Sequence, residues 1–371
     1  MMPPRDLVIE ALLHPESLAA LRPVEWDLLV RQARRANLLG RIALLFDERG
    51  LTDTVHPAAR PHFDSGAAMA RRQDIAIRWE VRCIREALDR AGVPLVLLKG
   101  AAYVMAGLPV ARGRMFSDVD VIVPKPALPE VESALMIHGW HSSHHSAYDQ
   151  RYYRTWMHEI PPMQHVRRGT VIDVHHAILP GTARIKADSA AMAAAAVLAP
   201  GEERVFTFAP ADMVLHSATH LFHEGEFDNG LRDLADLDGL LRHFGREPSF
   251  WADLVPRARA LGLARPLYYA LRYASLLLDT PVPAAVIAEA RAGEPPGPLR
   301  PLLDFCFSRA LRPAHASCGD RWTPLARKLL YVRSHWLRMP FPLLAVHLAR
   351  KAFVSEPTPE TQANAPSQPR R

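Results

Sequence analysis

Three aspartates lie inside apolar segments whose pattern is typical of β-strands. Asp118 and Asp120 alternate with valine in the run Phe-Ser-Asp-Val-Asp-Val-Ile-Val at 116–123, and Asp173 lies in a second apolar run at 171–175. Because side chains alternate between the two faces of a strand, both carboxylates of the first run should face the same side. Two carboxylates this close raise each other's pKa, so the pattern requires a cationic partner.

A divalent metal ion is the natural partner of such acids. Mg²⁺ binds few protein carboxylates and leaves coordination positions for substrate phosphates, and Mn²⁺ is the alternative ion. We therefore predict that Asp118, Asp120 and Asp173 are the catalytic residues and the metal ligands of a site for phosphoryl or nucleotidyl transfer. The other interpretation is a pair of surface aspartates on an edge strand.

The pattern around these acids changes twice along the chain. Apolar residues recur at helical spacing up to Gly92, a residue that favours the end of a helix. A mixed strand and helix pattern follows, and helical spacing returns after Pro180. The chain therefore has four expected parts: an N-terminal helical region at 1–91, an α+β core at 92–185, a C-terminal helical domain at 186–353 and a disordered tail at 354–371.

The α+β core should place a strand at 93–98 before a short helix at 101–106, and a helix at 127–138 after the first acid-bearing strand. Residues 140–168 are rich in histidine and aromatic residues, and we expect one or two strands and a mobile loop there. The sequence Arg-Arg-Gly-Thr at 167–170 favours a hairpin turn that leads into the second acid-bearing strand.

The two helical regions show their clearest helical spacing in nine segments, each bounded by proline, glycine or a change of pattern. These expected helices are 6–13, 23–37, 38–48 and 57–91 in the first region, and 210–223, 230–244, 250–261, 266–278 and 324–338 in the second.

Composition narrows the class of protein. The chain has 371 residues and a net charge of +6, and its three cysteines show neither metal-ligand spacing nor the density of a disulfide framework. No apolar run is long enough to span a membrane and no signal peptide pattern is present, so we expect a cytoplasmic protein. The basic excess suits nucleotides, anionic membranes or nucleic acid. No RNA-binding motif or zinc-finger spacing accompanies it, so we expect no nucleic-acid partner.

The segment 325–353 is basic and aromatic and has two interpretations. It could form a helix in peripheral contact with the inner face of a membrane. The ordinary explanation is a set of packed helices with basic residues at both ends.

The order of these motifs resembles the nucleotidyltransferase superfamily of polymerase beta, and more closely its bacterial branch of uncharacterised nucleotidyltransferases. The segments that carry the resemblance are Leu97–Ala102, Arg114–Val123, Gly139–Trp140, Ile172–His176 and Asp212–Leu241. The resemblance implies an α+β fold, in which a polymerase-beta-like core (a small mixed sheet with helices) is flanked by N-terminal and C-terminal helical regions.

The resemblance also implies a reaction. Asp118 and Asp120 would bind the catalytic metal ions, and Asp173 would complete the site beside the attacking hydroxyl. A nucleoside monophosphate would pass from a nucleoside triphosphate such as ATP to an acceptor, with release of pyrophosphate. The acceptor is not identified; a small molecule, a saccharide, a peptide or a protein would each suit the reaction.

Besides a purely helical interaction module, in which the acids would only cap helices or face solvent, two other functions stay open. One is a nucleotide-binding protein without catalysis, because Ala101 and Ala102 follow Gly100 where the superfamily usually has a second glycine or a serine. The other is a metal-dependent phosphohydrolase or phosphotransferase built on similar acids, which would release inorganic phosphate.

Three residues near the first acid-bearing strand are candidates for nucleotide binding. Gly100 would present backbone amides to the triphosphate at the start of a helix. Lys99 would add positive charge there, or it is a solvated residue at the end of a strand. Arg114 would reach a phosphate with its planar guanidinium, or it is a counter-ion of Asp118 or Asp120.

Three further candidates lie later in the chain. His175 shares a strand face with Asp173, where it could orient a phosphate, accept a proton or hydrogen-bond a metal-bound carboxylate. The resemblance places His220 and Asp233 at the nucleotide cleft, facing it from the helical domain.

Histidines in the middle region offer a second metal hypothesis. His141, His144 and His145 would need Asp149 or Glu159 to complete a zinc site. The alternative is a solvated loop over the mouth of the active site.

The later helices show two more patterns. His216, His220 and His223 fall on one helical face, where they would either bind a metal or pack between domains. Arg232 and Asp236 are four residues apart, the spacing of an ion pair on a helix surface.

Overall fold

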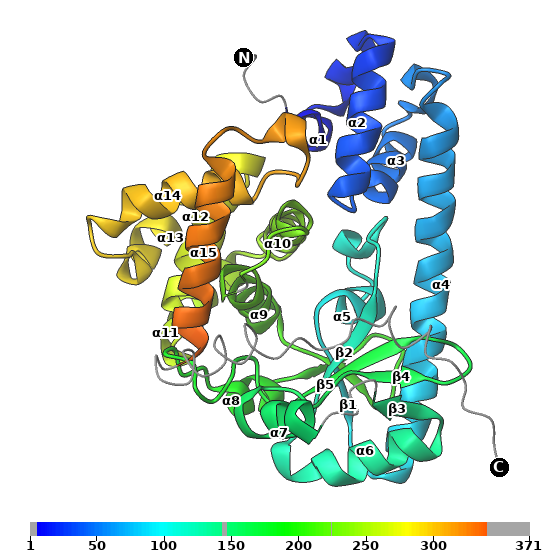
Figure 1. Cartoon of the computed structure of the whole chain (residues 1–371), viewed down its shortest axis with the longest axis vertical. Coiled ribbons are helices and arrows are strands. Elements are labelled where there is room, and N and C mark those ends of the chain that lie inside the picture. Colours follow the sequence, from blue (N-terminus) through cyan, green and yellow to red (C-terminus); the bar gives the residue numbers. More distant parts are fainter. Residues whose placement is uncertain (1–5, 143–146, 224, 340–371) are drawn as a thin grey trace, which may run out of the picture.

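The structure is a computed structural model that describes residues 6–142, 147–223 and 225–339. These residues form a mixed α+β fold, with one sheet at one end of the molecule and helices that extend away from it (Figure 1). The expected tail at 354–371 and the final part of the basic segment, 340–353, lie outside the described residues.

The sheet contains seven strands among the described residues, in the order β3-β4-β5-β2-β1-β7-β6. The pairs β2–β5 and β1–β7 are parallel and the other neighbouring pairs are antiparallel. The central strands are apolar because both faces of the sheet are covered there. The strands are β1 (Leu95–Leu97), β2 (Asp118–Ile122), β3 (Trp140–Ser142), β4 (Met163–His165), β5 (Val171–His175), β6 (Val197–Leu198) and β7 (Val205–Thr207).

The sheet extends beyond residue 185, where the sequence pattern placed the end of the α+β core. The expected return to helices after Pro180 is wrong at 197–207, because β7 pairs with β1 in parallel, with Val96 opposite Phe206. Strands this short have no readable alternation of their own, and pairing with a neighbouring strand is what defines them.

Histidine-rich residues 140–168 include the two short strands β3 and β4, as expected. The turn at 167–170 also connects β4 to β5 as an antiparallel hairpin. Helix α7 (Ala147–Trp156) also occupies part of this segment, and no helix was expected there. Residues 143–146, where the chain leads from β3 to α7, lie outside the described residues.

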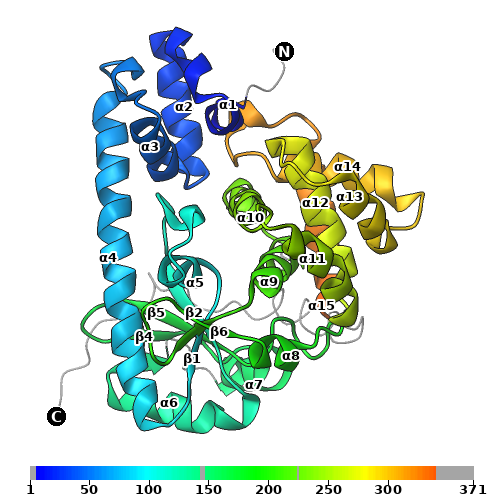
Figure 2. The ribbon, with the colours of Figure 1, turned by 180° about the vertical axis from the view of Figure 1, so that it is seen from behind.

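Helix α4 (Arg60–Arg90) runs along one side of the molecule and connects the N-terminal helices to the sheet (Figures 1 and 2). Its apolar side is buried, and Gly92, with φ of 68°, follows its end as the sequence predicted. The other N-terminal helices are α1 (Leu7–Leu13), α2 (Pro23–Arg35) and α3 (Leu39–Glu48), in agreement with the predicted segments to within a few residues.

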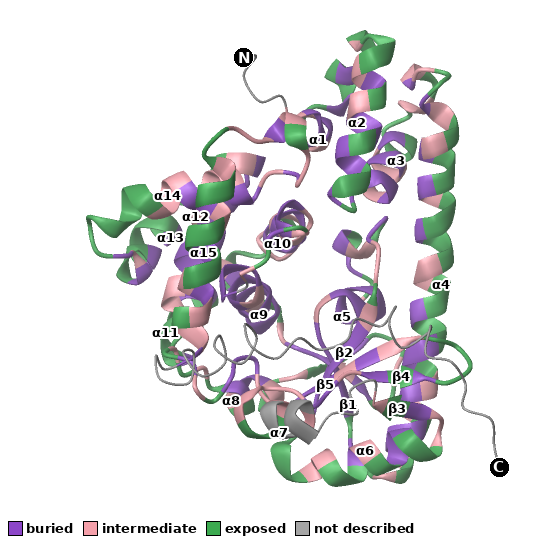
Figure 3. Ribbon diagram, viewed as in Figure 1, coloured by how far each residue is buried: buried purple, intermediate pink, exposed green. Residues whose placement is uncertain are grey.

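Helices α9 (Pro210–His223) and α10 (Gly230–Phe244) are buried along most of their length (Figure 3). They lie between the sheet and the outer helices α11 (Pro248–Ala260), α12 (Ala264–Leu278) and α15 (Thr323–Arg338). All five were expected at nearly these positions. The remaining α-helices are α5 (Lys99–Met105), α6 (Leu128–Ile137), α8 (Ser189–Ala194), α13 (Ala284–Ala290) and α14 (Leu299–Ala310).

Short 3-10 helices connect several of these elements. They are η1 (Pro15–Ala20), η2 (Thr52–Thr54), η3 (Pro109–Ala111), η4 (Lys125–Ala127), η5 (Arg291–Gly293) and η6 (Ala316–Cys318). None of the helices in the described ranges is both long enough and apolar enough to cross a membrane.

Candidate active site

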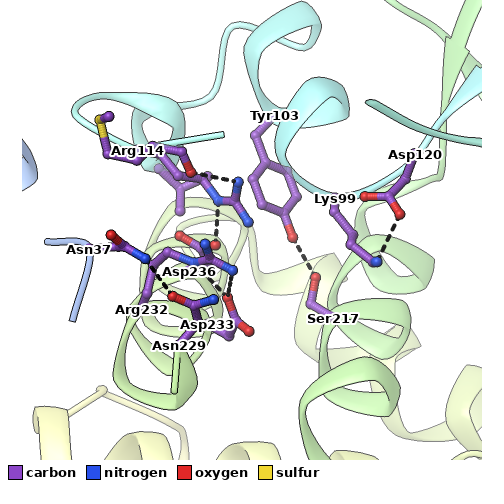
Figure 4. Close-up of polar contacts among 12 residues, drawn as sticks. Asn37, Lys99, Tyr103, Arg114, Asp120, Ser217, Asn229, Arg232, Asp233 and Asp236 are labelled. Atoms are coloured by element: carbon purple, nitrogen blue, oxygen red, sulfur yellow. Dashed lines mark hydrogen bonds and ion pairs between the residues drawn. The ribbon is translucent and has the colours of Figure 1, made fainter. Parts of the chain in front are cut away.

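A cavity of about 210 Å³ lies where β2, the start of α5, α9 and α10 meet (Figure 4). It brings together seven of the nine residues that the sequence identified as catalytic or nucleotide-binding. Those seven are Lys99, Gly100, Arg114, Asp118, Asp120, His220 and Asp233. Asp173 and His175 are the other two, and they are not among the residues that line this cavity.

The three predicted catalytic aspartates lie on neighbouring strands, as expected. Parallel pairing of β2 with β5 places Asp120 opposite Asp173 and Asp118 opposite Val171. Partnered residues of adjacent strands face the same side of a sheet, so all three carboxylates emerge on one face. Their negative charges are therefore concentrated in one place.

Lys99 supplies a cation to this group. Its Nζ lies 2.9 Å from Asp120 Oδ1, and only 18% of its side chain is exposed, so the solvated alternative for Lys99 is wrong. Burial opposes ionisation of Asp120, but Lys99 and His175 hold the pKa of its carboxyl well below the usual range. Lys99 adopts a φ of 46°, which is strained for a residue with a side chain.

His175 lies between two acids. Its Nε2 is 3.0 Å from Asp120 Oδ1 and its Nδ1 is 3.3 Å from Glu159 Oε2. The ring is buried and both nitrogens face carboxylates, which matches the carboxylate-bonding alternative. The expectation of a direct nucleotide contact by His175 is not supported by this geometry.

Asp118 and Asp173 lack comparable compensation. Burial and the charge of Asp120 raise the pKa of Asp118. Burial, followed by the charges of Asp120 and Asp118, raises the pKa of Asp173 to about 7. Asp173 Oδ1 is buried and has no hydrogen-bond partner within the described part of the chain. A buried, unsatisfied carboxylate oxygen among other acids is what a hard divalent cation would satisfy.

The acids do not form a closed metal cage. Within the described ranges, the only group of three or more potential ligands whose atoms all lie within 4.8 Å of one another is His158, Glu159 and His175. The donor chemistry of Asp118 and Asp173 suits Mg²⁺. An ion that also binds Asp120 would share that carboxylate with Lys99.

The structure tests only some of the other histidine hypotheses. His144, His145 and the side chain of Asp149 lie outside the described residues, so the proposed zinc set is not tested as a whole. His216 packs edge-on against Phe208, and His223 Nδ1 lies 3.1 Å from the Thr219 carbonyl oxygen. These two histidines therefore match the packing alternative.

Arg114 is an ion-pair partner, but not of the strand acids. Its Nε donates to Asp236 Oδ2 at 2.7 Å, and its guanidinium lies over the rings of Tyr103 and Phe116. The prediction that Arg114 pairs with Asp118 or Asp120 is wrong, because Asp236 of α10 places a buried carboxylate beside the guanidinium. The fixed guanidinium still lines the cavity.

Asp236 is likewise not the surface residue that its spacing suggested. It is 3% exposed, and it accepts hydrogen bonds from Arg114 and from Arg41 of α3. Burial opposes its ionisation, yet the two arginines lower the pKa of its carboxyl. Arg232 pairs instead with its neighbour Asp233, at 2.8 Å. The buried cluster thus joins the N-terminal helices, the loop before β2 and α10.

Several cavity residues were missed from the sequence. Tyr103 of α5 shares a short hydrogen bond with Ser217 of α9 (Figure 4), and Ser117 and Asn229 also line the cavity. One signal was available for Ser217, because it lies on the helix of His216 and His220. Ser117 also had a signal, because it directly precedes Asp118 in sequence, whereas Tyr103 and Asn229 come close to the other residues only when α5, α9 and α10 pack together.

Gly100 allows the close approach of Arg114 and Phe116. A Cβ at this position would lie 2.7 Å from the Phe116 ring and closer still to the Arg114 guanidinium. We expect Gly100→Ala to destabilise the protein by about 1–3 kcal/mol in urea unfolding, through overpacking. Gly181→Ala is the control, because no atom lies within 4 Å of its added Cβ, and it should change stability by less than about 0.5 kcal/mol. Equal effects would show that the space around Gly100 can relax.

A family model described as uncharacterised nucleotidyltransferase matches residues 22–279 of the chain. The match begins just before α2, includes the whole sheet and ends with α12. It therefore includes every residue of the candidate site. No curated protein and no solved structure matches the chain.

Proposed function

This chain belongs to the family of uncharacterised nucleotidyltransferases, and we propose that it transfers a nucleoside monophosphate from a nucleoside triphosphate to an acceptor, with release of pyrophosphate. The observation that carries the proposal is the group of three aspartates on one sheet face, two of them with raised pKa values, beside a cavity lined by cations. We also propose that the core is of the polymerase-beta type, and that the protein is bacterial and cytoplasmic.

Asp118, Asp120 and Asp173 would hold Mg²⁺ or Mn²⁺ in this proposal. The bound ion would lower the pKa of the attacking hydroxyl and stabilise charge on the reacting phosphate. The carboxylates that repel one another in the free protein are the groups that the ion would neutralise.

Residues of the chain itself would position the triphosphate. Lys99 and Arg114 place positive charge on the cavity wall, and both are held by buried acids, so little side-chain entropy is lost on binding. His220 and Asp233 would contact the nucleotide from the helical side. Burial, followed by the charge of Lys99, lowers the pKa of His220 well below its usual range, so its ring is neutral and can accept or donate a hydrogen bond.

The first experiment measures melting temperature with each nucleoside triphosphate, with and without Mg²⁺, for wild type and Asp118→Asn. Binding to the native state raises stability by RT ln(1 + [L]/Kd), so one triphosphate should give a Mg²⁺-dependent shift that the variant loses. The exposed Asp253→Asn on α11 is the control and should keep the shift. The absence of any shift in wild type would contradict the proposed nucleotide site.

The products then identify the reaction. Incubation with the stabilising triphosphate and fractionated acceptor candidates should release pyrophosphate. Release of inorganic phosphate instead would indicate a phosphohydrolase, and binding without any release would indicate a nucleotide-binding protein that lacks catalysis.

Metal affinity should depend on pH in a direction that Asp173 sets. With a pKa of about 7, its carboxyl holds a proton below that pH, and an incoming ion must displace the proton. We expect affinity for Mn²⁺ to rise about tenfold per pH unit up to about pH 7 and then to level off. Titration calorimetry measures this, and Asp173→Asn should bind weakly with a flat profile.

The same pKa predicts the stability of the metal-free protein. Because the native state retains the Asp173 proton up to a higher pH than the unfolded chain does, the free energy of unfolding should fall as pH rises from about 4 to about 7.

The metal titration has its own contradicting outcome. A steep pH dependence of Mn²⁺ affinity that persists in Asp173→Asn would assign the displaced proton to another group.

A further inference from the structure

A second cavity lies in the C-terminal helical region, between α12, α14 and α15, which are neighbours in both views of the ribbon (Figures 1 and 2). Its volume is about 760 Å³, which is within the range of sites that hold a whole small ligand. It shares no lining residue with the cavity beside the aspartates. The proposed transfer reaction leaves it without a role.

The walls and mouth of this cavity are apolar. Leu303, Cys306 and Leu330 line its interior, and Leu302 and Trp336 stand at the mouth, where Trp336 is 50% exposed. The exposed apolar surface continues along α15 as a stripe with helical spacing. The stripe consists of Trp322, Leu325, Leu329, Val332 and Trp336. Continuous exposed apolar surface of this kind marks binding sites more often than ordinary protein surface.

Three arginines line the same cavity, and none of its lining residues is acidic. They are Arg184, Arg265 and Arg333, and in the described part of the chain none of them forms an ion pair. Arg184 Nε donates to the Trp336 carbonyl oxygen at 2.9 Å, and its guanidinium stacks 3.9 Å from the Trp336 ring. Cations beside apolar walls are usually compensated by acids, and no acid among the residues that the structure describes pairs with these three.

Arg265 and Arg333 have the least compensation for their positive charge. Arg265 Nε is buried without a hydrogen-bond partner among the described residues. Arg333 donates to the Phe222 carbonyl oxygen at 2.8 Å and lies over the rings of Tyr269 and Phe307. Burial lowers the pKa of the Arg333 guanidinium, and the nearby charge of Arg265 lowers it further. An anion between the two would relieve both effects.

We propose that this cavity binds an amphiphilic anion, with its aliphatic chain along Leu303, Cys306 and Leu330 and its carboxylate or phosphate group at Arg265 and Arg333. The apolar walls account for the chain and the uncompensated guanidinium groups for the head group. The site is separate from the nucleotide cavity, so it stands whether or not the transfer reaction does.

Single-chain probes of opposite charge test the site. Dodecanoate and dodecyl phosphate, below their micelle concentrations, should each raise the melting temperature and bind with a stoichiometry of one by calorimetry. Dodecyltrimethylammonium has the same chain and the opposite charge, and it should bind at least tenfold more weakly. Equal binding of the cation would overturn the proposal.

The same set of binding experiments distinguishes a free amphiphile from a lipid in a membrane as the source of the head group. Vesicles that contain phosphatidylglycerol test an anionic membrane surface. Vesicle binding without binding of monomeric dodecanoate would place the interaction on the exposed stripe and would overturn the cavity site. Binding of the monomeric anions supports the cavity, with or without vesicle binding.

Variants then locate the site. Arg265→Gln should weaken dodecanoate binding by about tenfold or more, because a charge-assisted hydrogen bond is lost. Leu302→Trp fills the mouth from a half-exposed position and should block binding without unfolding the helices, as circular dichroism will show. The exposed Arg72→Gln on α4 is the matched control and should bind like wild type. Unchanged dodecanoate binding in both cavity variants would overturn the assignment.

Discussion

Asp118→Asn is expected to reduce nucleotidyl transfer by about 10³-fold or more while the protein stays folded. Loss of a metal-binding carboxylate removes several kcal/mol of transition-state stabilisation, and each 1.36 kcal/mol is a factor of ten. The folded state should not suffer, because burial and the charge of Asp120 already raise the pKa of Asp118 and disfavour its charged form. Pyrophosphate release and urea unfolding measure the two effects on the same preparation.

Asp120→Ala should behave differently, although it is only two residues away on the same strand. Asp120 accepts hydrogen bonds from Lys99 Nζ and His175 Nε2, so its removal leaves a buried ammonium group without its acceptor. We expect a loss of about 3–5 kcal/mol of stability in addition to the loss of activity. Equal stability of the two variants would show that Lys99 finds another partner, and full activity of Asp118→Asn would remove Asp118 from the proposed metal ligands.

Asp236→Ala should be the most damaging substitution away from the strand acids. Its carboxylate is buried between Arg41 and Arg114, which come from α3 and from the loop before β2. Removing one partner of a buried ion pair leaves uncompensated charge and costs about 3–5 kcal/mol. Urea unfolding by circular dichroism measures this loss.

Asp47→Ala is the control for Asp236. Asp47 also pairs with an arginine, Arg71, at 3.0 Å, but both side chains are more than half exposed. Such a surface pair contributes about 1 kcal/mol or less. If Asp236→Ala cost no more than Asp47→Ala, the buried cluster would not hold the three parts of the fold together.

Local sequence was sufficient for the elements that are long or strongly patterned. The helices α2, α4, α9 and α10 were predicted to within a few residues, because helical spacing of apolar residues can be read within a single segment. For α4, Gly92 also marked the end of the helix. The short strands β6 and β7 were missed, because β7 is defined by its pairing with β1 and β6 by its pairing with β7. Helix α7 was missed because its residues are mostly polar and aromatic, with few aliphatic residues to indicate a buried helical side.

Side-chain partners followed a similar division. The acid-bearing strands, and the common face of Asp118 and Asp120, followed from alternation, whereas the parallel pairing that places Asp173 opposite Asp120 came from the structure. The partner of Arg114 did not, because the competing carboxylate, Asp236, is 122 residues away in sequence. The partner of His175 Nδ1, Glu159, was not predicted either, because the sequence suggested Glu159 only as a possible zinc ligand.

The sequence by itself determined the family, the order of the helical and α+β parts, and which acids stand in the central strands, because these depend on residue type and local spacing. Tertiary structure alone decided which charges meet. Lys99 faces Asp120, Arg114 faces Asp236, and Tyr103 meets Ser217 because α5, α9 and α10 pack around one point. Electrostatic interactions and hydrogen bonds depend on distance in space, and local spacing does not encode the distance between residues that are far apart in the chain.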